Sequence, residues 1–341
     1  MFVNRISCSY LVKAGAKVHY FIGIKKKFLK KIPIFIFIMY FCPCNMAINA
    51  LSILIPTYND PCVTLVDALR HQAEAAGIRY EILVADDGST SEETIAANSI
   101  IGDWPHCRYI RREQNIGRAA IRNFLVSEAT CPYVLFIDSD MTMINNQFLA
   151  RYLDTDCDTV IDGGIVVSGD VDKLPGKNLR YLYEKAEEPR HIASERQKSP
   201  YQHLHTANLL VRRDLMVTNP FDERFRYYGY EDVLLGKIFR QQHIPILHID
   251  NPLGFCVFET NADFVAKTEE GLRTLRQFRD DLRGYSRLLT FVSGIHIPVI
   301  LSIIRFWHRL WGAAERRNLC GTHPSLTIFK LYRLGYYLSL K

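Results

Sequence analysis

Tyr133-Val-Leu-Phe-Ile-Asp-Ser-Asp140 is the stretch around which the rest of the chain is organised. Its apolar and aromatic residues form an unbroken run, which is typical of a strand buried on both faces of a sheet. Asp138 and Asp140 follow directly, and the carboxyl end of a strand is where an open α/β sheet binds ligands. Carboxylates bind Mg2+ or Mn2+, and these ions bridge phosphates. The stretch therefore predicts a metal-assisted nucleotide-phosphate site; the alternative is an acidic turn without a ligand.

The composition of the chain is that of a globular protein. Of its 341 residues, 48% are hydrophobic and 23% are charged, which excludes a disordered chain. The net charge is +6, and the basic residues gather at 25–31 and 305–317. This distribution favours an anionic membrane surface over a nucleic acid as the basic partner. The nine cysteines include no Cys-x-x-Cys pair, which predicts reduced thiols in a cytoplasmic protein.

Residues 1–45 differ from the rest of the chain. A basic run at 25–31 precedes an apolar run at 32–44, which is shorter than the roughly 20 residues of a bilayer span and lacks a small-residue cleavage site. Met46 comes just before the first core strand. We expect Met46 to be the true start, and 1–45 to be an extension outside the fold; the alternatives are a membrane anchor and a cleaved signal peptide.

The first half of the chain alternates between strands and helices. Apolar strands are predicted from Leu51, Glu81, Cys107 and Tyr133, and the helices between them are expected to begin at Asp60-Pro61, at 89–91 and just after Gly117. This alternation indicates an α/β fold with a doubly wound, mostly parallel sheet. Polar residues end three of these strands, as a ligand crevice requires: Thr57 and Asn59, Asp86 and Asp87, Asp138 and Asp140. There is no Gly-x-Gly-x-x-Gly and no phosphate loop, which excludes dinucleotide-binding and triphosphate-hydrolase proteins.

The second half loses this alternation. Residues 159–168 and 203–212 resemble strands, residues 179–188 resemble a helix, and the polar residues 189–202 are expected to form a mobile loop over the site. A further helix is predicted to start at Glu231-Asp232. Carboxylates at a helix N-terminus are either capping and dipole residues or functional groups.

Five motifs follow one another along the chain: Pro56-Thr-Tyr-Asn59, Ala85-Asp-Asp-Gly-Ser-Thr90, Asn115-Ile-Gly-Arg118, Asp138-Ser-Asp140 and Gly229-Tyr-Glu-Asp232. Their order, and the elements on which they lie, are typical of family 2 glycosyltransferases with the GT-A fold, and the chain resembles that family over roughly residues 50–260. Further residues, namely Asn208, Phe221-Asp-Glu223 and the segment 259–270, resemble a bacterial branch of it.

The resemblance implies a role for each motif. Asp232 would be the catalytic base, and Glu231 beside it would contact acceptor or sugar. Asp140, with Asp138, would hold the metal. The third metal ligand has one weak candidate, His248, for which a hydrogen-bonded core histidine is the favoured interpretation. The implied nucleotide-sugar-binding residues are Pro56, Thr57, Tyr58, Asp86 (bracing the turn), Asp87, Asn115, Gly117, Arg118 and Asp138, the last toward ribose or sugar hydroxyls.

The implied enzyme transfers a sugar from a nucleoside diphosphate sugar, expected to be UDP-linked, to a hydroxyl of a glycan or lipid-linked acceptor in cell-surface polysaccharide synthesis. Mg2+ or Mn2+ would offset the charge of the departing diphosphate, and a carboxylate would take the acceptor's proton. One displacement inverts the anomeric centre. Processive members carry Gln-x-x-Arg-Trp where Arg240-Gln-Gln-His-Ile stands here, so we expect single additions. The alternatives are a nucleotidyltransferase, which the missing phosphate loop disfavours, and a non-catalytic sugar-nucleotide or glycan-binding protein.

Three segments are expected: the extension 1–45, a GT-A domain at 46–265 with a Rossmann-like nucleotide half and an acceptor half, and a helical extension at 266–341. In the last segment an apolar run at 288–304 precedes Trp307 and Trp311 beside arginines. This pattern favours peripheral contact with a membrane; the alternative is a helical hairpin packed on the domain. The expected location is the cytoplasm, at the inner face of the cell membrane.

Overall fold

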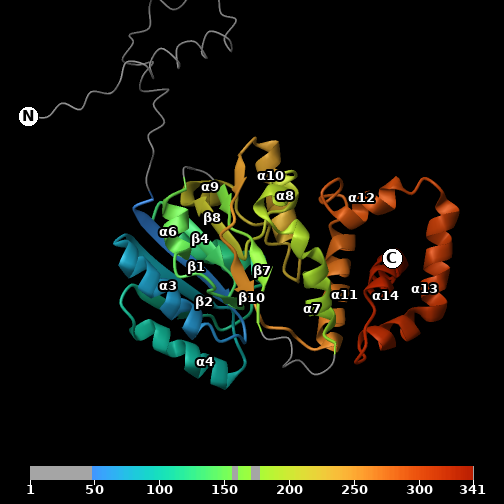
Figure 1. The fold of residues 1–341 in the computed structure, drawn as a ribbon, viewed down its shortest axis with the longest axis horizontal. Coiled ribbons are helices and arrows are strands. Elements are labelled where there is room, and N and C mark those ends of the chain that lie inside the picture. The colour runs from blue at the N-terminus through green and yellow to red at the C-terminus, as the bar shows by residue number, and fades with distance from the viewer. Residues whose placement is uncertain (1–47, 156–159, 170–176, 341) are drawn as a thin grey trace, which may run out of the picture. The chain divides into compact units, whose positions relative to one another are not determined.

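The computed structural model describes residues 48–155, 160–169 and 177–340. The segment 1–45, and with it the expectation about Met46, lies outside the described residues. Met46–Lys341 form one unit through their mutual contacts, and every element described below belongs to it (Figure 1).

A seven-stranded sheet forms the centre of this unit, in the order β3-β2-β1-β4-β8-β6-β9. The first four strands in this order are parallel, as are β6 and β9, whereas β8 is antiparallel to both of its neighbours. The predicted α/β fold with a doubly wound, mostly parallel sheet is confirmed. The strands are β1 (Ala50–Thr57), β2 (Arg79–Asp86), β3 (Cys107–Arg111), β4 (Tyr133–Ile137), β6 (Val160–Asp162), β8 (Asn208–Arg212) and β9 (Ile246–His248).

The strand order reverses between β1 and β4. β2 and β3 lie on one side of β1, and the chain then returns to the other side to form β4. In doubly wound sheets such a reversal opens a crevice at the carboxyl ends of the strands. β1 ends at Thr57 and β4 at Ile137, so the polar residues that follow both strands meet at this crevice.

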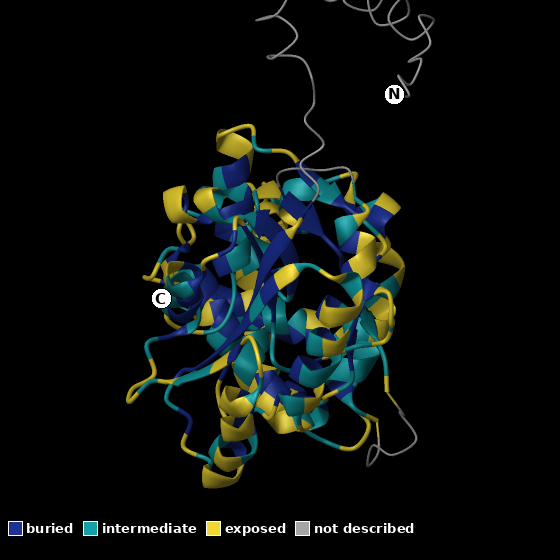
Figure 2. Cartoon of the chain, turned by 90° about the vertical axis from the view of Figure 1, so that its left-hand side faces the viewer, coloured by how far each residue is buried: buried dark blue, intermediate teal, exposed yellow. Residues whose placement is uncertain are grey.

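All five residues of β4 are buried, as the opening stretch predicts. Phe136 belongs to the apolar core on one face of the sheet and Leu135 to the core on the other, because successive side chains of a strand point to opposite faces. Figure 2 shows the buried strands with partly exposed helices around them. The first core includes residues of α5 (Arg118–Glu128), α9 (Arg213–Thr218) and α10 (Glu231–Gln241), and the second includes residues of α3 (Val63–Ala76) and α6 (Phe148–Leu153).

Several predicted helix ends are present. Gly77 ends α3 in the left-handed conformation with φ 65°, which glycine adopts at little cost. Ser91 caps α4 (Glu92–Ser99) through its side chain, which accepts a hydrogen bond from the Thr94 amide; the 3-10 helix η2 (Ile100–Asp103) follows. α10 begins at Glu231, as expected.

The predicted start of α3 at Asp60-Pro61 is wrong, since the helix begins at Val63 after Cys62. The Asn98 side chain of α4 accepts a hydrogen bond from the Cys62 amide at 2.9 Å and donates one to the Asp60 carbonyl at 3.0 Å. A residue distant in sequence therefore satisfies the backbone groups that a local cap would satisfy. The Asp60 side chain is left at the rim of the crevice instead.

The strand-like run 159–168 is two strands in different sheets. β6 joins the large sheet, and β7 (Ile165–Val167) joins a three-stranded sheet with β10 (Leu253–Phe255) and β5 (Met141–Thr142). Gly163 and Gly164 form the break. A Cβ on Gly163 would lie 2.4 Å from the Tyr152 hydroxyl, and Gly164 has φ 81°, so the chain bends where no side chain fits.

The predicted mobile loop 189–202 is a sequence of short helical turns, and the Arg196 side chain in it is only 1% exposed. Its guanidinium donates hydrogen bonds to Asp162 and to the Ile249 carbonyl, both at 2.7 Å. A single buried arginine in a polar segment has no periodic pattern, which is why the sequence does not indicate this anchoring. The turns are η4 (Glu188–Arg190), α8 (Ala193–Arg196) and η5 (Pro200–Gln202), and the predicted strand after them, β8, begins at Asn208 instead of His203.

Helices dominate the C-terminal part, as expected. The anticipated domain boundary at 265/266 falls inside α11 (Asn261–Gln277), which contributes Leu272 and Leu275 to one sheet core and packs Phe264 and Val265 against Leu179 of α7 (Leu179–Glu187). The helices α12 (Arg287–Gly294), α13 (Pro298–Leu319) and α14 (Leu326–Ser339) follow, and α13 packs along α14 as a hairpin. Within the described residues, we find no helix with the length and apolarity that crossing a membrane requires.

Candidate active site

The crevice at the carboxyl edge of the sheet is a cavity of about 1510 Å³. Pockets of about 300–1,000 Å³ hold drug-sized ligands, so this one has room for two substrates. Its walls come from the ends of β1 and β4, the N-terminal ends of α5 and α10, and the sides of α7 and α11. The predicted site residues that line it are Pro56, Thr57, Tyr58, Asp87, Asn115, Gly117, Arg118, Asp138, Asp140, Glu231 and Asp232. Asp86 and His248 are not part of the lining.

Asp86 and Asp87 hold the turns at the floor of the cavity. Asp86 is fully buried and accepts hydrogen bonds from the Ser89 amide at 2.7 Å and from the Tyr109 hydroxyl. Asp87 accepts from the backbone amides of Ile116 and Gly117 at 2.8 and 3.0 Å. Asp86 thus has the contacts of a bracing residue, whereas Asp87 braces its loop and also faces the cavity.

Gly117 allows the loop before α5 to lie close to the opposite wall. Its φ is 94°, and a Cβ at this position would lie 2.7 Å from the Arg226 carbonyl oxygen. A side chain here would therefore collide with backbone as well as strain its own conformation. The glycine brings the start of α5, and with it Arg118, into the cavity wall.

Two arginines one turn apart on α5 connect the two predicted acidic motifs. Arg122 donates from Nη2 to Asp138 at 2.6 Å and from Nη1 to Glu231 at 3.2 Å. Arg118 donates from Nε to Glu231 at 3.0 Å, and its Nη2 lies 3.6 Å from Asp138. We call these four residues the arginine bridge. It joins the end of β4 to the start of α10.

The two carboxylates of each acidic motif have pKa values shifted in opposite directions. Burial alone would raise the pKa of Asp138 and Glu231, but Arg118 and Arg122 outweigh it and lower both. Burial raises the pKa of Asp140 to about 6, with a further contribution from the charge of Asp138. Burial and the neighbouring Glu231 raise the pKa of Asp232 to about 6 as well. Each motif therefore contains one carboxylate whose pKa is lowered by the arginines and one whose pKa is raised to about 6.

The carboxylates of Asp138 and Asp140 suit a metal ion that is also bound by a phosphate. Both Asp138 oxygens face guanidinium groups, so this carboxylate is already neutralised. The Asp140 carboxylate has no hydrogen-bond partner among the described residues. In that same part of the chain, no three His, Cys, Asp or Glu side chains are grouped to hold a metal. Mg2+ commonly uses one or two carboxylates and completes its shell with substrate phosphates and water, and Asp140 fits that arrangement.

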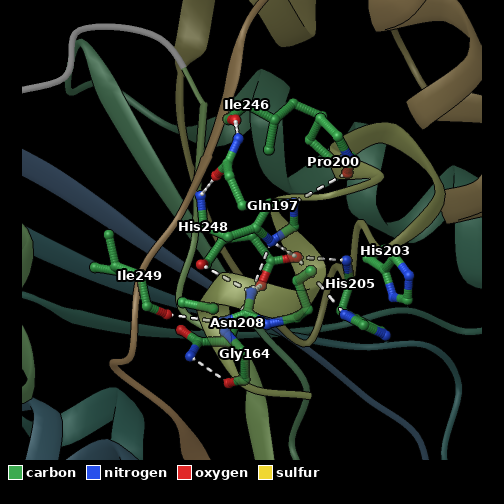
Figure 3. A network of polar contacts seen from close by, with 12 residues as sticks. Gly164, Gln197, Pro200, His203, His205, Asn208, Ile246, His248 and Ile249 are labelled. Atoms are coloured by element: carbon green, nitrogen blue, oxygen red, sulfur yellow. Dashed lines mark hydrogen bonds and ion pairs between the residues drawn. The ribbon is translucent and has the colours of Figure 1, made fainter. Parts of the chain in front are cut away.

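His248 takes part in a network of buried polar contacts (Figure 3). Its Nδ1 accepts a hydrogen bond from Arg196 at 2.7 Å, and its Nε2 lies 3.0 Å from the Pro200 carbonyl, to which it donates. Both ring nitrogens are thus used, and burial lowers the pKa of the ring. The favoured interpretation as a core histidine is correct, and His248 is not placed to bind a metal.

The same network brings a residue into the site that sequence reasoning missed. His205 lines the cavity, its backbone amide donates to Asp162 at 2.9 Å, and its ring Nδ1 lies 3.7 Å from the same carboxylate. Asp162 raises the pKa of His205 against the effect of burial. No local pattern marks His205, because its placement depends on Asp162 and Arg196. Arg122 lies four residues after Arg118, which places both on one face of the helix, but sequence reasoning gave it no role in the site.

Comparisons with known proteins find similarity to glycosyltransferases. The model of the family described as "Glycosyl transferase family 2" matches residues 52–217. The uncharacterized glycosyltransferase YibD of Escherichia coli is 35% identical over 94 residues, which are 27% of this chain and about a quarter (26%) of that protein. Among solved structures, TarS 1-349 of S. aureus is 17% identical with a TM-score of 0.44 over 85% of this chain and 90% of that one. Mannosyl-3-phosphoglycerate synthase of Rubrobacter xylanophilus is 15% identical with a TM-score of 0.48 over 68% and 74%.

Proposed function

We propose that this chain, a member of glycosyl transferase family 2, transfers a sugar from a nucleoside diphosphate sugar to an acceptor hydroxyl with inversion of the anomeric centre. The observation that carries the proposal is the pairing of Asp140 and Asp232 in one cavity. The pKa of each is raised to about 6, and the arginine bridge lies between the two motifs. One carboxylate suits a metal–diphosphate and the other suits a proton transfer, as glycosyl transfer requires.

The proposed donor site lies at the reversal between β1 and β4. Tyr58 is 48% exposed at this edge, so its ring can stack on a base. Asp87 and Asn115 line the same part of the cavity and can accept or donate hydrogen bonds to base and ribose. The likeness of these motifs to the family supports a UDP-linked donor.

Asp232 is the proposed base. The acceptor oxygen forms its bond to carbon 1 while its proton passes to an Asp232 oxygen. The bond between carbon 1 and the diphosphate oxygen breaks, and its electron pair leaves with the diphosphate. A single displacement of this kind inverts the centre. A pKa of about 6 suits a base that works near neutral pH. A Mg2+ or Mn2+ ion held by Asp140 would offset the diphosphate charge.

Glu231 is proposed to orient a sugar hydroxyl. Its Oε1 accepts from both arginines, but its buried Oε2 has no hydrogen-bond partner among the described residues. A buried carboxylate oxygen without a partner is costly unless a ligand donates to it. Because Glu231 lines the cavity, a donor or acceptor hydroxyl can supply that hydrogen.

Peripheral membrane contact is proposed for α13. Val299, Ile303, Phe306 and Leu310 form one stripe of this helix, at spacings of three and four residues, and are each about 60% exposed, from 59% to 63%. Residues 287–319 hold five arginines and one acidic residue, Glu315, which is buried. An apolar stripe flanked by tryptophans and arginines suits the interface of an anionic bilayer. This surface supports a lipid-linked acceptor, a location at the inner face of the cell membrane, and a role in cell-surface polysaccharide synthesis.

A thermal-shift titration with UDP, GDP and other nucleoside diphosphates, with and without Mn2+, tests the donor site. Ligand at about 100 times its Kd stabilises a protein by roughly 2.7 kcal/mol. We expect a Mn2+-dependent shift with one nucleotide, UDP. A folded protein that shifts with none of them would contradict the proposal. Product formation with an acceptor then separates a transferase from a non-catalytic binder.

Vesicle sedimentation tests the membrane surface. We expect the full chain to bind vesicles that contain phosphatidylglycerol and the variant Ile303→Asn/Phe306→Asn to bind at least 10-fold more weakly, because burying each apolar side chain is worth about 1.5–3 kcal/mol. Val217→Asn is the matched control, since Val217 is 57% exposed on α9. Equal binding by all three proteins, or self-association through α13 without vesicle binding, would contradict this part of the proposal.

A further inference from the structure

Two cations that the donor motifs do not include project into the cavity from its helical wall. Lys267 lies on α11 and Arg180 on α7, and both line the cavity with Asp140. The Lys267 ammonium lies 4.7 Å from the centre of the Tyr228 ring, and the Arg118 guanidinium lies 5.4 Å from the same centre. Cationic groups from three helices therefore converge near one end of the site.

The packing of aromatic rings holds these cations in place. Arg180 lies 4.0 Å from the centre of the Phe255 ring, and Lys267 and Arg118 share Tyr228. Such contacts fix the direction of a flexible side chain and contribute about 0.5–2 kcal/mol each. Phe255 belongs to β10 and Tyr228 precedes α10, so the cations are positioned by elements that also shape the acidic motifs.

The hydrogen-bonding capacity of Lys267 is largely unused. Its ammonium has three donors, but in the described part of the chain its one ion-pair partner is Glu259, at 3.5 Å, and it makes no hydrogen bond there. Glu259 also accepts from Arg180 at 2.5 Å, so two cations share this carboxylate. Burial lowers the pKa of Lys267, and the charges of Arg180 and Arg118 lower it further. An anion bound among the three cations would relieve this repulsion.

We propose that Lys267 and Arg180 bind the diphosphate of the sugar nucleotide and stabilise it as it leaves, which rests on the glycosyl transfer proposed above. When the bond between carbon 1 and oxygen breaks, the electron pair moves onto the terminal phosphate of the nucleoside diphosphate. Lys267 and Arg180 donate hydrogen bonds to that phosphate, and the acceptor's proton moves to Asp232. The two cations thereby share the charge with a metal ion that Asp140 would hold, for which the described residues offer no group of three His, Cys, Asp or Glu ligands.

The roles that the resemblance implies for the motifs do not include these two residues. Lys267 lies outside residues 52–217, which the family model matches, whereas Arg180 lies inside them. The two side chains are 87 positions apart, and they meet because α7 and α11 pack against each other around Leu179, Phe264 and Val265.

Binding measurements with UDP, UMP and uridine test the proposal on the full chain. For Lys267→Gln we expect UDP to bind about 10- to 100-fold more weakly, because a charge-assisted hydrogen bond to the terminal phosphate is lost. UMP should change much less and uridine should not change. Lys267→Arg keeps the charge and should bind UDP within a few-fold of the wild type. Lys330→Gln, on the exposed side of α14, is the matched control.

The outcomes separate this inference from the proposed function. The assignment of Lys267 is wrong if the wild type binds UDP and Lys267→Gln binds it equally well. It is also wrong if Lys267→Gln loses affinity for UDP, UMP and uridine by the same factor. An unchanged UDP affinity with a higher KM for the acceptor would place Lys267 in the acceptor site instead and also overturn it. If the wild type binds no nucleoside diphosphate of any base, the glycosyl transfer itself fails. If it prefers another base, the same series is measured with that base.

Discussion

The acidic motif after β4 and the acidic motif at the start of α10 share one arrangement. In each, the first carboxylate (Asp138 or Glu231) is bound by Arg118 and Arg122 and has a lowered pKa, and the second (Asp140 or Asp232) is not paired with these arginines and has a raised pKa. The motifs differ in what their second carboxylate faces. Asp140 lies near the cations Arg180 and Lys267, whereas Asp232 lies near the His205 ring. The comparison teaches that in each pair one carboxylate is bound by the arginines and the other stays free of them, which is the division of roles that the proposed function needs.

The largest effect is expected from Asp232→Asn. The amide cannot accept the acceptor's proton, so the transfer rate should fall by about 100- to 10,000-fold while the Kd for UDP changes little. Enzyme kinetics and calorimetry on the same preparation measure the two quantities. Asp103→Asn, an exposed substitution, is the control. Full activity in Asp232→Asn would show that Asp232 is not the catalytic base.

The substitution Arg122→Met tests whether the arginine bridge stabilises the fold. Arg122 is 1% exposed, and Arg122→Met leaves Asp138 and Glu231 without their closest common partner. The loss of one partner of a buried ion pair costs about 3–5 kcal/mol, so the free energy of unfolding in urea should fall by that amount. Arg108→Met removes an exposed pair with Glu128 and should cost no more than about 1 kcal/mol. Similar losses in the two variants would mean that the bridge is not structural.

Asp140→Asn tests whether Asp140 binds the metal ion. We expect UDP to stabilise this variant equally with and without Mn2+, so that the Mn2+-dependent part of a shift of roughly 2.7 kcal/mol disappears. The substitution Asp60→Asn, at the same rim of the cavity, should retain the Mn2+ dependence. A metal-dependent shift that survives in Asp140→Asn would place the ion on other residues.

The pH dependence of kcat/KM follows from the raised pKa of Asp232. The base acts in its charged form, so kcat/KM should fall as the pH falls through about 6, approaching a tenfold loss per pH unit below it. Asp140 titrates in the same range, and the profile therefore reports both groups together. A rate that stays constant down to pH 4.5 would exclude Asp232 as the base.

The smallest effect concerns stability. The pKa of Asp232 in the folded protein, about 6, lies above the ordinary value of 3.8, so the charged carboxylate disfavours folding. This cost is absent below pH 3.8 and complete above about pH 6. The free energy of unfolding of Asp232→Asn should therefore be about 1–3 kcal/mol higher than that of the wild type at pH 8. Near pH 4 the two proteins should be equally stable. A variant that is less stable at pH 8 would contradict this sign.

The parts of the site that could be predicted are those with a local pattern. The apolar run before Asp138 predicts a buried strand, and the turn residues after Asp86 predict the end of another; parallel strands then bring their carboxyl ends to one edge. The bracing by Asp87 and the arginine bridge could not be predicted in the same way. Arg122 and Glu231 are 109 positions apart, and neither residue's neighbours in sequence indicate the other.

The sequence by itself determined the alternation of strands and helices, the sheet edge where the cavity lies, and the resemblance to a glycosyltransferase family, because these follow from short-range periodicity and from motifs of adjacent residues. The tertiary structure alone decided which carboxylates are neutralised, since the pKa of each depends on guanidinium groups brought from a different element. It also decided that Arg196 orders the segment 189–202, that His248 belongs to the core, and that Lys267 and Arg180 face Asp140. Charge interactions act through space over a few ångströms, and the packing of distant helices sets those distances.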